Sequence, residues 1–231
     1  MWIVFGVIVF IVGVSVLPFL KWRREQKERR EKLFSRLSKR GDNILNALDK
    51  VSDRYLTRDT KIFILDHLIS VISVISELIK ANYESSFVLR KEELVRMATE
   101  LSLGQQVTSK DMVANQEQLD QTNEALEYLL KEVRIMPDNF GVSRSVVRHH
   151  LLLIRYANAL VYRDLLVRQA RQDLDNDRKS QALEKYRDAL ALIEKNGSVA
   201  SSKREKVRLK KMIKDVETLL FKKEPSESRV E

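Results

Sequence analysis

The chain has 231 residues, a net charge of +9 at neutral pH, 6 glycines, 3 prolines and no cysteine. With 44% hydrophobic and 32% charged residues, it has the composition of a helical globular protein rather than of a disordered or all-β one. The lack of cysteine excludes a disulfide scaffold, thiolate metal sites and cysteine catalysis. We therefore predict an all-α protein with one principal domain.

The positive charge is concentrated in two segments. Residues 21–40 hold ten Lys or Arg against three Glu, a net charge of +7. Residues 203–223 hold nine basic residues against three acidic ones, a net charge of +6, so the middle of the chain is close to neutral. The alkaline character therefore belongs to the two ends of the chain and not to its body.

The N-terminal segment is apolar enough to predict a transmembrane anchor over residues 1–20. Residues 2–20 carry no charge, and a helix of that length spans about 28 Å, close to the hydrocarbon thickness of a bilayer. A cleaved signal peptide has basic residues before a shorter apolar core and a small-residue cleavage site after it. Here only Met1 and Trp2 precede the run, and no such site follows. A cleaved signal and an apolar core helix are the alternatives.

The flanks of this segment predict its orientation. Basic residues stay on the cytoplasmic side, and they follow the apolar run but do not precede it. We predict a single-pass protein of the bacterial inner membrane, with the N-terminus outside and the body in the cytoplasm. The residues predicted to lie at the membrane interfaces are Trp2, Lys21, Trp22, Arg23 and Arg24. Gly6 and Gly13 share one helix face, where small residues allow two anchors to associate.

Residues 21–40 predict a basic juxtamembrane helix. Glu25 with Arg29, and Glu28 with Lys32, have the i,i+4 spacing that stabilises a helix. Cations beside a membrane contact anionic headgroups, so the lipid bilayer is the expected partner. Nucleic acid attracts the same cations but is disfavoured because the anchor is adjacent.

Residues 41–223 predict an α-helical cytoplasmic domain, followed by a disordered polar tail over residues 224–231. Each glycine of the domain follows a helical pattern and is expected to end a helix; the four are Gly41, Gly104, Gly141 and Gly197. Asp42 is expected to cap the next helix. The predicted helices cover residues 43–56, 59–83, 86–103, 109–136, 143–173, 178–195 and 202–223.

Residues 61–80 could be mistaken for a second membrane span. Their polar members recur every three or four residues and form one narrow stripe, while Ile, Val, Leu and Phe cover the rest. Such a helix is typical of a central core helix, and Asp, His and Glu inside a lone span are costly. We therefore predict a core helix.

The C-terminal half contains a tetratricopeptide-like pattern. Its small, aromatic and small side chains at helical spacing are Ala182, Tyr186 and Ala189. On these residues, the segment 163–197 resembles the helical hairpin of the tetratricopeptide repeat family, which implies hairpin packing and protein binding. Gln169 and Asp173 depart from the family's apolar pattern, and an array needs about three units.

We find no motif for the common routes of catalysis, including phosphate-binding loops, zinc motifs, nucleophile elbows and calcium loops. His149 and His150 are adjacent and diverge on a helix, as do Asp66 and His67. We predict no catalytic site, no metal and no cofactor, and histidines that are satisfied or partly exposed.

Two segments remain as candidates for binding. The arginine-rich segment 144–171 is a core helix or a partner surface, and the residues expected to bind a protein partner are Arg148, Arg155, Tyr156, Tyr162 and Arg163. The basic helix 202–223 is expected to cap the bundle, with contact to lipid or nucleic acid as alternatives. We predict a membrane-anchored interaction or scaffold protein. The alternatives are a membrane-tethered nucleic-acid-binding protein and an enzyme of unrecognised type.

Overall fold

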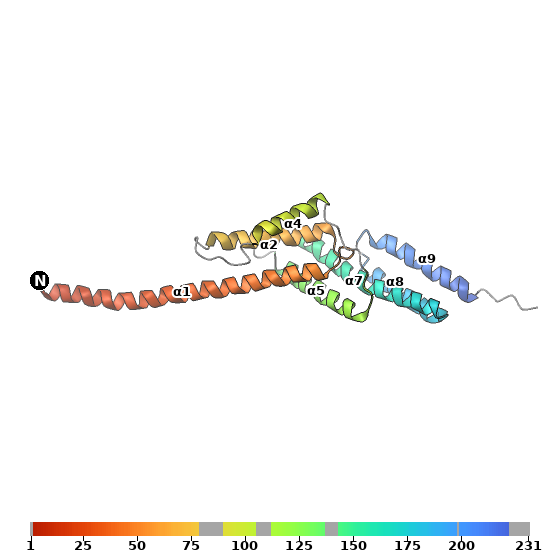
Figure 1. Ribbon diagram of the computed structural model, residues 1–231, viewed down its shortest axis with the longest axis horizontal. Coiled ribbons are helices and arrows are strands. Elements are labelled where there is room, and N and C mark those ends of the chain that lie inside the picture. Colours follow the sequence, from red (N-terminus) through yellow and green to blue (C-terminus); the bar gives the residue numbers. More distant parts are fainter. Residues whose placement is uncertain (1, 79–89, 105–111, 137–142, 198, 222–231) are drawn as a thin grey trace, which may run out of the picture.

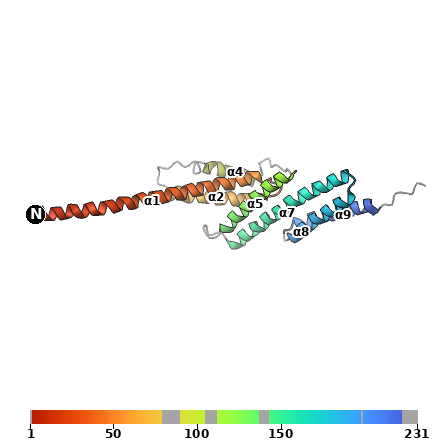
Figure 2. The same cartoon turned by 90° about the horizontal axis from the view of Figure 1, so that it is seen from below.

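The structure is a computed structural model that describes residues 2–78, 90–104, 112–136, 143–197 and 199–221. Within these ranges the chain forms seven α-helices and no strand, which confirms the all-α fold. The helices are α1 (Trp2–Lys50), α2 (Arg58–Leu78), α4 (Lys91–Leu103), α5 (Gln116–Ile135), α7 (Arg144–Asp175), α8 (Lys179–Lys195) and α9 (Ser202–Phe221). Figures 1 and 2 show α1 as a long rod that projects from a bundle formed by the other helices.

Helix α1 is continuous over 49 residues, a length of about 74 Å. The predicted break at Gly41 with a cap at Asp42 is wrong, because both residues lie inside this helix. Contacts with α5 hold the helix together there: Arg40 Nε lies 2.5 Å from Glu132 Oε2, and Ile44 is buried. Burial of apolar side chains outweighs the cost of about 1 kcal/mol for a glycine within a helix.

Within the described part of the chain, no helix combines the length and the apolarity needed to cross a membrane. Residues 2–20, the predicted anchor, are helical as the start of α1, but the side chains of residues 2–18 lie outside the described residues. The structure therefore does not support the predicted transmembrane helix, which stays a prediction. The predicted segment boundaries at residues 20 and 40 do not coincide with helix ends.

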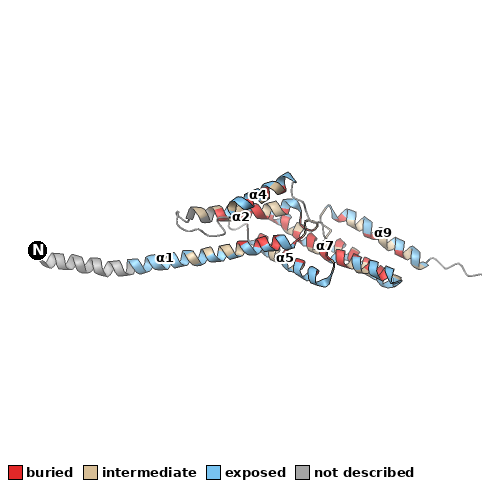
Figure 3. Cartoon of the chain, viewed as in Figure 1, coloured by how far each residue is buried: buried red, intermediate tan, exposed pale blue. Residues whose placement is uncertain are grey.

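The first hydrophobic core lies between the end of α1, helices α2, α4 and α5, and the first half of α7. Helix α2 contributes four aliphatic side chains that are at most 2% exposed, Ile64, Leu65, Leu68 and Ile72, while Asp66 and Ser70 face solvent. This confirms the prediction of a core helix over residues 61–80 for the part that is described. Figure 3 shows that burial is concentrated where the helices cross and is low along the projecting part of α1.

The second core lies between the other half of α7, α8 and α9. The small residues of the predicted hairpin, Ala170, Ala182 and Ala189, are fully buried, together with Tyr186. Helices α7 and α8 therefore pack against each other through these residues. Leu209 and Val216 of α9 are also buried, so α9 caps this hairpin as expected.

Helix α7 belongs to both cores, and Leu160 near its middle packs against each of them. The two cores are therefore joined by one uninterrupted helix and not by a linker. Helices α5 and α2 contact α7 directly, with α1 packed on α5 and α4 packed on α2, while α8 packs along α7 and α9 packs on α8.

The helix ends follow local chemistry. Gly104 ends α4 in the left-handed conformation, with φ of 72°, as glycine after a helix commonly does. Helix α5 begins later than predicted from Ser109, because Asn115 caps it by accepting a hydrogen bond from the Gln118 backbone N–H at 2.8 Å. Gly197 follows α8 as predicted. The predictions for Gly141 and for residues 224–231 lie outside the described residues.

Candidate functional site

A pocket of about 210 Å³ opens where the two cores meet. Its walls come from the turn between α1 and α2, from the segment before α5, and from α7 and α9. The residues that line it are Arg54, Met112, Arg163, Asp164, Val167, Arg168, Arg171, Glu205, Arg208, Leu209 and Met212. Five of these eleven residues are arginines, so we call it the arginine pocket.

Asp164 is the centre of a buried network at the base of this pocket. Arg54 donates from Nε to Oδ2 at 2.5 Å and from Nη2 to Oδ1 at 3.2 Å. Arg163 lies 2.6 Å from Oδ1 through Nη1, and the Tyr55 hydroxyl donates to Oδ2 at 3.2 Å. The side chain of Asp164 is 1% exposed. Both carboxylate oxygens are satisfied, as a buried charge requires.

The network extends to two further segments. Arg163 Nη2 lies 2.6 Å from Glu205 Oε2, which connects α7 to α9. The backbone N–H of Val113 donates to the Tyr55 hydroxyl at 2.9 Å, which attaches the segment before α5. Burial raises the pKa of Tyr55 to about 12, and the hydrogen bond to Asp164 raises the pKa of Arg54. These protonation states therefore persist across the physiological pH range.

Three arginines of the pocket lie outside this network. Arg168, Arg171 and Arg208 are exposed, and within the described part of the chain neither Arg168 nor Arg208 forms an ion pair. The pocket therefore holds five guanidinium groups and only two carboxylates, those of Asp164 and Glu205. The excess of three positive charges is chemically suited to an anion.

The structure divides the five residues predicted to bind a partner into two groups. Arg148, Arg155 and Tyr162 are exposed, seven residues apart along one side of α7. Tyr156 and Arg163 are buried at 5% and 4% exposure, in the second core and the charge network. The burial of Arg163 is compensated by acidic partners on α7 and α9.

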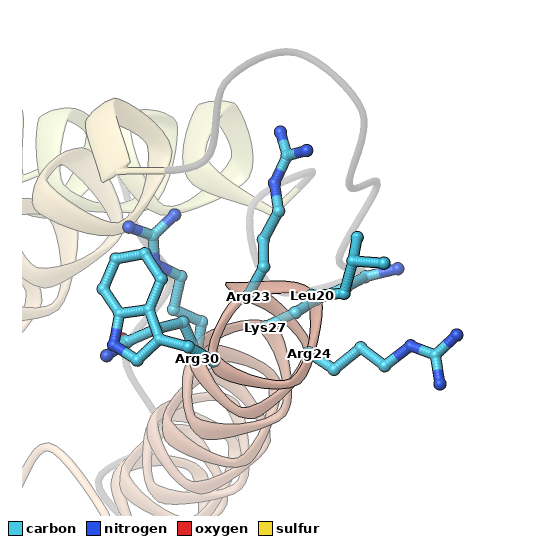
Figure 4. A pocket seen from close by; sticks show the side chains of 7 residues that line it. Leu20, Arg23, Arg24, Lys27 and Arg30 are labelled. Atoms are coloured by element: carbon cyan, nitrogen blue, oxygen red, sulfur yellow. The ribbon is translucent and has the colours of Figure 1, made fainter. Parts of the chain in front are cut away.

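The side chains of residues 19–30, near the start of α1, form a cationic surface that we call the stalk surface. Phe19, Leu20 and Trp22 are exposed, Trp22 at 57%. A hollow of about 650 Å³ runs beside them, lined by Leu20, Trp22, Arg23, Arg24, Gln26, Lys27 and Arg30. Figure 4 shows Arg23 and Arg24 extended away from the helix in different directions. No acidic side chain is among these lining residues.

The predicted interface residues Lys21, Trp22, Arg23 and Arg24 therefore share one exposed stretch of α1. The side chain of Trp2, the fifth of them, lies outside the described residues. An indole ring beside cations and exposed apolar side chains is the combination found at membrane–water interfaces.

Two of the three histidines, His67 and His150, are buried. The ring of His150 stacks on Phe63 with centroids 4.1 Å apart, and its Nδ1 lies 3.1 Å from Thr60 Oγ1. Burial and the nearby Arg40 lower the pKa of His67 to about 4. Among the described residues, no group of three metal-binding side chains occurs.

Sequence reasoning missed Arg54, Asp164 and Glu205. Asp164 stands next to Arg163 within the otherwise apolar stretch "LVYRDLLV". A charged pair inside an apolar helical run is a signal for a buried ion pair, and it was available from the sequence. The contacts from Arg54 and Glu205 depend on packing between distant segments and carry no local signal.

Comparison with protein-family models, with curated protein sequences and with solved structures finds no match for this chain. The functions of the arginine pocket and of the stalk surface are therefore inferred from the chemistry of their own side chains.

Proposed function

We propose that this protein is a membrane-anchored scaffold, with its N-terminus outside, whose cytoplasmic helical body binds other proteins at the inner membrane. The observation that carries the proposal is the continuity of α1 from residue 2 into the first core. A helix without a break connects the apolar N-terminal segment to the body. From Leu20 to Phe34, where α1 begins to pack against the first core, it spans about 21 Å, so the body stands away from the membrane surface on a helical support.

The stalk surface supports the membrane part of the proposal. Cations next to a membrane contribute about 1 kcal/mol each to the attraction for anionic lipids. Arg23, Arg24, Lys27 and Arg30 lie together beside Trp22 without an acidic neighbour in the hollow. Their position directly after the uncharged segment matches the order of anchor, interface and cytoplasmic domain.

An exposed stripe on α7 supports the part of the proposal that concerns protein partners. The stripe consists of Arg148, Leu152, Arg155 and Tyr162, and Arg and Tyr are enriched in the residues that dominate binding energy at interfaces. The Asn123 amide of α5 donates to the Tyr162 hydroxyl at 3.1 Å, which fixes the aromatic ring at the edge of the stripe. Confinement to a membrane raises the effective concentration of such a stripe toward partners in the same membrane.

Single-cysteine labelling tests the anchor and its orientation. The chain has no cysteine, so Ser145→Cys in the exposed start of α7 gives one reactive thiol. We expect the protein in the membrane fraction, and labelling by a membrane-impermeant maleimide only after the cells are permeabilised. Labelling in intact cells contradicts the orientation, and recovery of the intact chain from the soluble fraction contradicts the anchor.

Site-specific crosslinking in intact membranes tests the stripe. A photo-reactive amino acid at Arg155 is expected to give an adduct with a different protein, while the same group at Glu184, which is exposed on α8, gives none. Adducts with only the chain itself contradict the scaffold proposal and favour self-assembly. Equal adducts at both positions contradict the assignment of the stripe.

A further inference from the structure

We infer that the arginine pocket binds the phosphate group of a small soluble molecule, a phosphate ester or pyrophosphate. The inference goes beyond the scaffold proposal and stands apart from it, because no residue of the pocket belongs to the stalk surface or to the exposed stripe. It concerns a ligand site within the body itself.

The charge balance favours a phosphate over a single carboxylate. Asp164 is matched by its contacts with Arg54 and Arg163, and Glu205 is matched by Arg163. Arg168 and Arg208 form no ion pair within the described part of the chain and lie on facing helices, α7 and α9. A phosphate monoester carries about −1.5 to −2 charges at neutral pH, which is the charge that two such guanidinium groups neutralise. Guanidinium groups also match phosphate oxygens in geometry.

A second observation concerns the buried arginine of the pocket. Arg163 is 4% exposed and lines the pocket, but its buried Nε has no hydrogen-bond acceptor in the described structure. Buried donors without an acceptor are rare and destabilising. An anion in the pocket offers Nε an acceptor, while Oε2 of Glu205, which likewise lacks a hydrogen bond, lies 2.6 Å from Arg163 Nη2.

The size and the position of the pocket indicate a small soluble ligand. Its volume of about 210 Å³ corresponds to about seven water molecules, which accommodates a phosphate group with a few carbon atoms. Met112, Val167, Leu209 and Met212 supply apolar walls for those atoms. The pocket is lined by Arg54, which follows the C-terminal end of α1, whereas the stalk surface lies between residues 19 and 30 of that helix. Under the proposed anchoring, this separation disfavours the headgroup of a lipid.

Calorimetric titration of the full chain in nanodiscs with pyrophosphate tests the inference. The informative variant is Arg168→Gln with Arg208→Gln. Its control is Lys211→Gln with Lys214→Gln, which removes the same charge from exposed positions of α9 outside the pocket. We expect the native chain to bind one equivalent, the pocket variant to bind at least about ten-fold more weakly, and the control to change by less than about two-fold.

Three results overturn the inference. The first is no binding to the native chain, or binding that disappears at about 0.15 M chloride as diffuse attraction does. The second is an equal loss in both variants while their unfolding temperatures match that of the native chain. The third is weaker pyrophosphate binding when the nanodiscs contain phosphatidic acid, since that result assigns the pocket to a lipid headgroup. The salt and lipid results need only the native chain.

Discussion

The two hydrophobic cores differ in the side chains that fill them and in the sequence separation of the helices that form them. The first core is filled mostly by large aliphatic residues, and it joins segments that run from the end of α1 to the middle of α7. The second core has a larger share of small side chains, with four alanines among its eleven buried residues, and its helices are neighbours in sequence. The first therefore depends on volume and long-range pairing, and the second on close approach of helix backbones. The charge network centred on Asp164 lies between them.

The largest expected effect comes from breaking that network. Replacing Asp164 with Ala leaves the guanidinium groups of Arg54 and Arg163 without their buried partner, and removing one member of a buried ion pair costs about 3 to 5 kcal/mol. Denaturant unfolding measures this loss. Asp188→Ala, at an exposed position of α8, is the control and should change the free energy of unfolding by less than about 0.5 kcal/mol. Equal losses contradict the role of the network.

Removal of volume from the first core should have the next largest effect. Ile64 in α2 is 0% exposed, and Ile64→Ala is expected to lower the free energy of unfolding by about 2 to 5 kcal/mol because it leaves a cavity. Ile62→Ala on the same helix, at a partly buried position, should cost less. If the two variants lose the same stability, the first core is not close-packed around Ile64.

The second core should instead be sensitive to added volume. Ala182 is 0% exposed between α7 and α8, so Ala182→Leu is expected to cost about 1 to 3 kcal/mol through overpacking. Ala191 lies on the exposed side of the same helix, and Ala191→Leu is the matched control with almost no cost. Thermal unfolding of both variants distinguishes them. Tolerance of leucine at Ala182 contradicts the close approach of these helices.

The smallest expected effect is a dependence of the free energy of unfolding on pH, caused by the buried His67. Burial lowers the pKa of His67 to about 4, below the unfolded value near 6.5, so the unfolded chain binds more protons between these values. The contribution of His67 to the free energy of unfolding is therefore at its maximum above about pH 6.5. It decreases as the pH falls toward 4, by on the order of 1 kcal/mol once solvent screening is allowed for.

His67→Leu should flatten this part of the stability–pH curve in equilibrium unfolding. A weaker slope remains from His150, whose pKa burial also lowers. An unchanged slope in the variant shows that other groups cause the pH dependence.

The contrast between the two cores also explains what the sequence could predict. Helices α7 and α8 and the start of α9 follow local patterns and lie within two residues of their predicted bounds, and the alanines Ala170, Ala182 and Ala189 are buried as their spacing indicates. The break at Gly41 was wrong because contacts of α1 with α5, about ninety residues away, hold the helix through the glycine. The arginine pocket was missed for the same reason, since Arg54 and Glu205 meet α7 only through tertiary packing.

The unbroken path of α1 has a mechanical consequence. A helix of this length acts as a lever, because its last turns are held in the first core while its first turns lie far from the body. Under the proposed anchoring, a change of about 20° in tilt, an ordinary value for membrane helices, moves the body sideways by about 7 Å over the roughly 21 Å of helix between Leu20 and Phe34. The thickness and lateral order of the surrounding membrane thereby set where the body can reach.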